Sequence, residues 1–151
     1  DEDKLLEAAT MALCWSRAWA GGGSHGTVYS VKPAQVSKTA NTGEFVGKGA
    51  FIVRGQRKWF KDLDVQIGIG IVAINGVPLL MGGTPNTIKN ICSRYAILAP
   101  GLTKKEQLAN KIYKNTGLIT DDILGILPGS GQIIEDYGIF SPPKKIEQEE
   151  E

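Results

Sequence analysis

The sequence has 151 residues, of which 42% are hydrophobic and 22% are charged. These proportions are typical of a globular domain and exclude disorder along the whole chain. The net charge is only +1, but it is unevenly distributed. Residues 8–61 hold eight basic side chains and a single acid, a local charge of +7, whereas both ends of the chain are acidic.

The two cysteines, Cys14 and Cys92, form no CxxC pair and predict neither a disulfide framework nor a zinc site. The chain does not open on a basic segment followed by an apolar run, so no secretory signal is predicted. The longest apolar stretch, residues 67–82, is interrupted by polar residues and a proline and is too short to span a bilayer. We therefore expect a cytoplasmic protein that has no membrane association and needs no metal or other cofactor.

The first half of the chain predicts one helix and then strands. Residues 4–20 are rich in strong helix formers and predict a single long helix, ended by the glycines at 21–23. The alternating residues 27–32 and the apolar run 50–54 each predict a strand. A basic segment, residues 55–62, follows as a connection or as a strand extension.

The clearest strand is predicted at residues 64–74. Apolar side chains fill one face of this strand, whereas Gly68 and Gly70 lie on the other. A strand face with two glycines predicts that another backbone or the helix approaches it closely. The Asn-Gly pair at 75–76 is typical of a type I′ turn and leads to a return strand at 77–81.

Short helices and strands are predicted towards the carboxy terminus. Thr84, followed by a proline, predicts the N-cap of a helix that reaches Cys92. Thr103 and Glu106 have the spacing of a capping box and predict a helix to Asn115. The remaining predicted elements are a strand at 94–99, a helix at 120–127 and a strand at 132–135.

Together these elements predict an α+β fold. We expect a mixed, largely antiparallel sheet with the long N-terminal helix packed on one face and the short C-terminal helices beside it. The domain is predicted to cover residues 1–140, and residues 141–151 are predicted to form a charged, flexible tail.

Few residues are candidates for catalysis or metal binding. The single histidine, His25, lies in a glycine-rich loop, and its spacing from acids predicts no Ser-His-Asp arrangement. Asp62 and Asp64 share a face if that segment is extended and could hold a hard cation, although strand-start acids are the simpler interpretation. The glycine pair at 82–83 precedes a helix and has a generic anion-binding geometry, or is a plain turn. We predict no catalytic residue and no metal ligand.

The basic stretch is the strongest candidate site. Four aromatic residues are interleaved with its cations: Tyr29, Phe45, Trp59 and Phe60. Cations neutralise phosphates and flat rings stack on unpaired bases, so this mixture is the one that nucleic-acid binding needs. Composition alone slightly favours the alternative, a solvated face that happens to be basic. Trp59 is interpreted either as a stacking residue or as part of the core. The predicted nucleic-acid-binding residues are Lys32, Lys38, Lys48, Arg54, Arg57, Lys58 and Trp59.

Several segments resemble one protein family in order and composition. They are LLEAATMALCWSRAWAGG, VYSVKPAQVSKTANTGEFVGKGAFIVRGQRKWF, DLDVQIGIGI and the later LLMGGTPNTIKNICSRYAILAPGLTKKEQLANKIYK and ILPGSGQII. From about Leu5 to Ile134 the chain resembles the C-terminal RNA-associated domain of the NFACT family, NFACT-R, in its archaeal and eukaryotic-type form. The family's domain begins further upstream, so the chain resembles the back part of a larger protein.

The resemblance implies a non-catalytic RNA-binding module of a ribosome-associated quality-control factor. Such factors bind a large ribosomal subunit that still carries peptidyl-tRNA, so the expected partners are tRNA or ribosomal RNA, the large subunit and the N-terminal domains of the same protein. A legacy fibronectin-binding label also exists in the family, but nothing in this sequence supports secretion. A sheet that lacks its upstream strands exposes an apolar edge, which favours a homodimer. The alternatives are a protein-docking module and, less favoured, a nucleic-acid-processing enzyme acting through Asp62 and Asp64.

Overall fold

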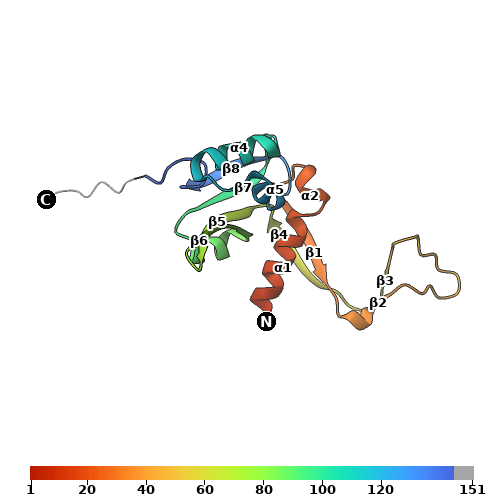
Figure 1. Ribbon diagram of the computed structural model, residues 1–151. Coiled ribbons are helices and arrows are strands. Elements are labelled where there is room, and N and C mark those ends of the chain that lie inside the picture. Colours follow the sequence, from red (N-terminus) through yellow and green to blue (C-terminus); the bar gives the residue numbers. More distant parts are fainter. Residues whose placement is uncertain (145–151) are drawn as a thin grey trace.

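A computed structural model describes residues 1–144 and confirms the α+β fold class (Figure 1). Of the predicted tail, residues 145–151 lie outside the described residues. The elements in chain order are α1 (Glu2–Cys14), α2 (Arg17–Ala20), β1 (His25–Ser30), a 3-10 turn η1 (Pro33–Gln35), β2 (Val36–Ser37), β3 (Ile52–Val53), β4 (Lys58–Asp64), β5 (Ile67–Ile74), β6 (Val77–Gly83), α3 (Pro85–Ile91), β7 (Tyr95–Thr103), α4 (Lys105–Thr116), α5 (Thr120–Gly125) and β8 (Gly131–Tyr137).

The predicted single N-terminal helix is two helices, α1 and α2, separated at Trp15 and Ser16. Ser16 has an extended backbone, and its hydroxyl accepts a hydrogen bond from the Ala18 N–H while donating one to the Leu13 carbonyl. A serine that caps a new helix in this way competes with continuation of the old one. The break turns α2 towards the C-terminal half, where Trp19 is buried.

Residues 25–64 form a long antiparallel hairpin that projects from the rest of the molecule, and we call it the β-arm (Figure 1). Its stem is β1 paired with β4, and further out β2 pairs with β3. Gln35 joins the two sides between these pairs, because its side-chain amide donates to the carbonyls of Arg54 and Gln56. The basic segment predicted as a connection or an extension is therefore strand β4 from Lys58 onwards, and its first residues connect β3 to β4.

The remaining strands form one four-stranded antiparallel sheet in the order β6-β5-β7-β8. The prediction of a single sheet is wrong in this respect, because β1 to β4 pair only among themselves. The strand predicted to stop before Pro100 continues to Thr103, with an irregularity at which Pro100 and Thr103 both pair with Gly131. Because a bulge accommodates the proline, the Pro-Gly pair does not end the strand.

The four-stranded sheet is covered on both faces. On one face, Ile67, Ile69 and Leu98 pack with side chains from α1, α2, α4 and α5 to form the core, which includes Leu13, Cys14, Trp19, Leu108, Ala109, Ile112, Ile123 and Leu127. On the other face, Ile88 of α3 lies against the glycines of β5. The close approach predicted from two bare glycines is confirmed.

We expect Gly70→Ala to destabilise the domain by about 1–3 kcal/mol, because a methyl group has no room there. A Cβ atom on Gly70 would lie 2.4 Å from Cys92 Sγ and 2.7 Å from Cys92 Cβ. Gly125→Ala is the matched control, since no atom lies within 4 Å of its added Cβ. Urea unfolding of both variants checks this prediction, and equal unfolding midpoints would contradict it.

Two predictions from local sequence patterns were confirmed, one for a turn and one for a helix cap. A third, for another helix cap, was wrong. Asn75 and Gly76 have φ values of 51° and 77°, as the predicted type I′ turn requires. The Thr84 hydroxyl caps α3 by accepting from the Thr87 N–H. The predicted capping box at Thr103 is wrong, because Thr103 belongs to β7 and the cap position is Lys104, which makes no side-chain cap bond.

Candidate nucleic-acid interface

Tyr29, Arg57 and Trp59 form a cluster on the open face of the β-arm stem. Tyr29 and Trp59 are opposite each other in the β1–β4 register, and their rings meet edge to face with centroids 5.2 Å apart. The Arg57 guanidinium lies 4.9 Å from the centre of the Tyr29 ring. Both rings are substantially exposed, Tyr29 at 42% and Trp59 at 53%, so the interpretation of Trp59 as a core residue is wrong.

The opposite face of the stem packs against α1. A Cβ atom on Gly26 would collide with the Leu13 side chain, which shows how closely the helix approaches. Lys58 lies on this face, 5.6 Å from the centre of the Phe60 ring, and forms an ion pair with Glu2 at the start of α1. Its hydrogen bond and charge lower the pKa of the Glu2 carboxyl. Strand alternation thus separates Lys58 from its neighbours Arg57 and Trp59.

Arg54 forms an ion pair within the arm. Its guanidinium donates two hydrogen bonds to the Glu44 carboxylate, at 3.1 and 2.8 Å. The Asn41 N–H donates to the same carboxylate, and the Glu44 N–H donates back to the Asn41 carbonyl. Beside Arg54 the pKa of Glu44 is lowered, and beside Glu44 the pKa of Arg54 is raised. Arg54 therefore fastens the distal loop of the arm, residues 38–51, to the segment between β3 and β4.

The other three predicted lysines, Lys32, Lys38 and Lys48, are spread along the arm, and all three are exposed. Lys32 lines a shallow pocket of about 300 Å³ at the outer end of the stem, together with Lys58 and Leu5 of α1. Lys38 and Lys48 flank the distal loop, and the Lys38 ammonium lies 5.1 Å from the centre of the Phe51 ring.

The structure thus gathers all seven predicted residues onto one projecting element but not onto one face. Residues 26–61 carry seven basic side chains and one acid, a net charge of +6. The predicted list omitted Tyr29, although the alternation of residues 27–32 assigned it to a strand. Gln35 and Glu44 were also missed, since no local pattern marks a residue that bridges two distant strands.

Ser24, His25 and Asp64 come together at the base of the arm, which the sequence did not predict. Ser24 Oγ lies 2.9 Å from His25 Nδ1, and His25 Nε2 lies 3.0 Å from Asp64 Oδ1. The His25 and Asp64 side chains are 56% and 67% exposed. Water therefore solvates both groups, whereas the acid of a catalytic triad is buried behind its histidine.

The other candidate sites have structural explanations. Thr84 at the start of α3 donates to the Glu7 carboxylate, so an acid already faces this helix end. Burial raises the pKa of the Cys14 thiol to about 11, which keeps it protonated at neutral pH. Within residues 1–144, no three His, Cys, Asp or Glu side chains are grouped as a metal site.

None of the helices in the described part of the chain has both the length and the apolar character needed to cross a membrane.

Comparison with known proteins gives consistent matches. Residues 1–55 match the model of the NFACT protein RNA binding domain. The chain is 33% identical over 134 residues to the archaeal Rqc2 homolog aRqcH of Methanocaldococcus jannaschii, covering 87% of this chain and 20% of that protein. It is 38% identical over 68 residues to the ribosome quality control complex subunit NEMF of Homo sapiens, covering 45% of this chain and 6% of that one.

The NEMF homolog of Drosophila melanogaster is 37% identical over 68 residues, which cover 45% of this chain and 7% of that protein. No solved structure matches the chain. The chain spans about a fifth of the length of its archaeal relative. The matched residues 1–55 contain α1, α2 and the β-arm from β1 to β3, without β4, and the archaeal match extends well beyond them. The chain therefore belongs to the NFACT family.

Proposed function

We propose that this chain is a non-catalytic RNA-binding module of a ribosome-associated quality-control factor and that the β-arm is its RNA-contacting element. The observation that carries the proposal is the open-face cluster of Tyr29, Arg57 and Trp59. A planar cation and two exposed rings are set side by side on a strongly basic projection. The family model supports RNA as the partner, and the names of the NEMF relatives support a role in ribosome quality control.

The roles follow from the contacts of each side chain. Lys32, Lys38, Lys48 and Arg57 contact phosphates, and Trp59 stacks on an unpaired base. Arg54 and Lys58 reach phosphates only by giving up their carboxylate partners or by sharing them. We therefore assign both mainly to holding the arm in shape.

In the complete protein, the module is proposed to engage the large ribosomal subunit that carries peptidyl-tRNA, together with the other domains of its own chain. This places it in the cytoplasm, where ribosomes work. The predicted homodimer stays a prediction. Such a dimer would form by strand pairing along β6 or β8, the outer strands of the four-stranded sheet.

The salt dependence of binding tests the proposal. Fluorescence anisotropy of labelled tRNA and of ribosomal RNA fragments is measured with this chain across a salt series. We expect micromolar binding whose logarithm falls linearly with the logarithm of salt concentration, with a slope reporting on the order of three to five released counterions. A slope near zero, or no binding at low salt, would contradict the proposal and favour the protein-docking alternative. RNA turnover that requires a divalent metal would favour the enzyme alternative.

A further inference from the structure

The distal loop of the β-arm presents a large apolar side chain almost completely to water. Phe45 is 91% exposed, although burying an aromatic ring of this size is worth about 2 kcal/mol. It lies in the segment that joins β2 to β3, at the outer end of the arm (Figure 1). Single exposed apolar residues are common on proteins, so exposure alone assigns no role. The backbone contacts and the charges around Phe45 indicate its role.

The backbone beside Phe45 is held in place. Glu44, its immediate neighbour, receives two hydrogen bonds from Arg54 and one from the Asn41 N–H, and its own N–H donates to the Asn41 carbonyl. These hydrogen bonds hold the backbone next to Phe45 in place, while the Phe45 ring itself is exposed to water. An aromatic ring on a fixed backbone loses little conformational freedom when it stacks on a partner.

The positive charge of the arm indicates which class of partner suits the Phe45 ring. Lys38 and Lys48 flank the loop, and the whole arm from 26 to 61 carries a net charge of +6. Phe51, the second aromatic residue of the loop, is 56% exposed and lies beneath the Lys38 ammonium. Cations beside flat rings suit a polyanion with accessible base faces, whereas an apolar protein pocket gains nothing from the positive charges of Lys38 and Lys48.

We propose that Phe45 is a second RNA contact, which stacks on an unpaired base while the flanking lysines hold the adjoining phosphates. This proposal rests on the function proposed above and adds the class of RNA. The arm should prefer RNA with unstacked bases, in loops or bulges, over a continuous duplex, whose stacked bases offer no free face.

The experiment compares two RNAs and four proteins. The probes are a hairpin with an unpaired loop and a fully paired duplex of equal length, both fluorescently labelled, and the readout is anisotropy at fixed salt. The proteins are the wild-type chain, Phe45→Ala, Phe45→Trp and the control Leu102→Ala. Leu102 is 99% exposed and lies in β7, outside the arm, so the control removes a similar exposed apolar side chain.

We expect Phe45→Ala to weaken hairpin binding about tenfold, with the salt slope unchanged because no charge is lost. Duplex binding should change by less than about twofold on the same argument. Phe45→Trp should restore hairpin affinity, and Leu102→Ala should leave it unchanged. Repeating the comparison with a tRNA and with a ribosomal RNA hairpin identifies which of them supplies the base.

Three results would overturn the proposal, and they are distinguishable. If Phe45→Ala binds the hairpin as tightly as the wild-type chain does, Phe45 makes no RNA contact and the proposed function stands. If the wild-type chain binds neither RNA, both proposals fail. A loss on Leu102→Ala equal to that on Phe45→Ala would show non-specific apolar adhesion and would also overturn the role of Phe45. Because Phe45 is exposed, its replacement should not unfold the chain, and circular dichroism checks this.

Discussion

Replacing Lys32, Lys38, Lys48 and Arg57 together by glutamine should weaken RNA binding about a hundredfold at physiological salt. Each phosphate contact that is lost removes about 0.7 to 0.9 from the slope of log affinity against log salt, so the slope should fall by about 3. All four side chains lie on the arm and none forms an ion pair within residues 1–144. Their loss therefore leaves the internal pairs of Arg54 and Lys58 in place.

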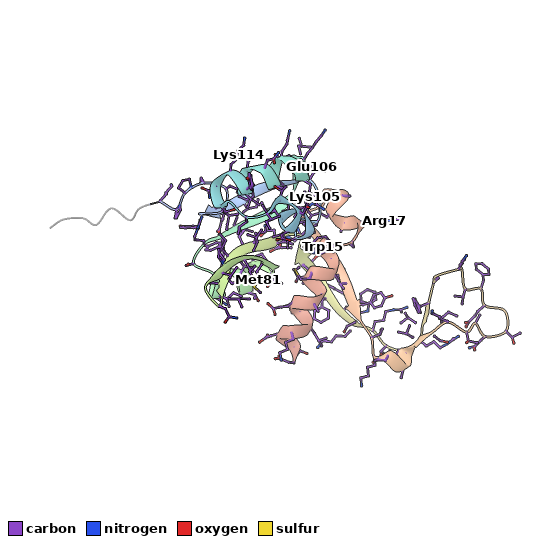
Figure 2. All side chains as sticks on the ribbon, viewed as in Figure 1. Trp15, Arg17, Met81, Lys105, Glu106 and Lys114 are labelled. Carbon is purple, nitrogen blue, oxygen red and sulfur yellow. The ribbon has the colours of Figure 1, made fainter. Side chains whose placement is uncertain are left out.

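A second quadruple variant separates local charge from total charge. Glutamine at Lys104, Lys105, Lys111 and Lys114 removes the same charge from α4 and its cap, at the other end of the molecule (Figure 2). We expect this control to bind RNA nearly as wild type does, since screening limits charge effects to about 10 Å at moderate salt. Equal losses for the two variants, measured by anisotropy across the salt series, would show that net charge matters and the arm does not.

Trp19→Ala should give the largest loss of stability, about 3–5 kcal/mol, which is a large part of the stability of a domain of this size. Trp19 is only 3% exposed, and its indole N–H donates to the Ser130 carbonyl at 2.8 Å. The ring also packs beside Gly129 and Gly131. One side chain thus joins α2 to the turn before β8, and its removal leaves a cavity and an unpaired carbonyl.

Trp15→Ala is the matched control, because the same substitution four residues earlier removes a ring that is 47% exposed. We expect it to cost about 1 kcal/mol or less. Trp19→Phe should fall between the two, since it keeps most of the packing but loses the hydrogen bond. Urea unfolding followed by far-ultraviolet circular dichroism measures all three, and equal midpoints for the two alanine variants would contradict the structural role of Trp19.

Local patterns were sufficient wherever one segment decides its own conformation. The Asn75-Gly76 turn, the Thr84 cap and the glycine face of β5 were all predicted correctly, because each depends on backbone preferences or on strand alternation. The prediction for β7 failed because that segment is shaped by a distant partner. Strand β7 continues through Pro100 because Gly131 of β8 pairs with both Pro100 and Thr103. No feature of the β7 sequence predicts that pairing.

The sequence by itself determined the composition of the candidate interface: a run of cations and aromatic rings between residues 26 and 61, with the family resemblance that this run carries. Only the tertiary structure decided which of these residues lie on the open face of the arm and which face α1. Strand alternation places Arg57 and Trp59 on the open face with Tyr29, whereas Lys58 faces α1 and pairs with Glu2. The physical reason is that a cation's availability to a ligand depends on which carboxylates lie within a few ångströms, and these come from residues far along the chain.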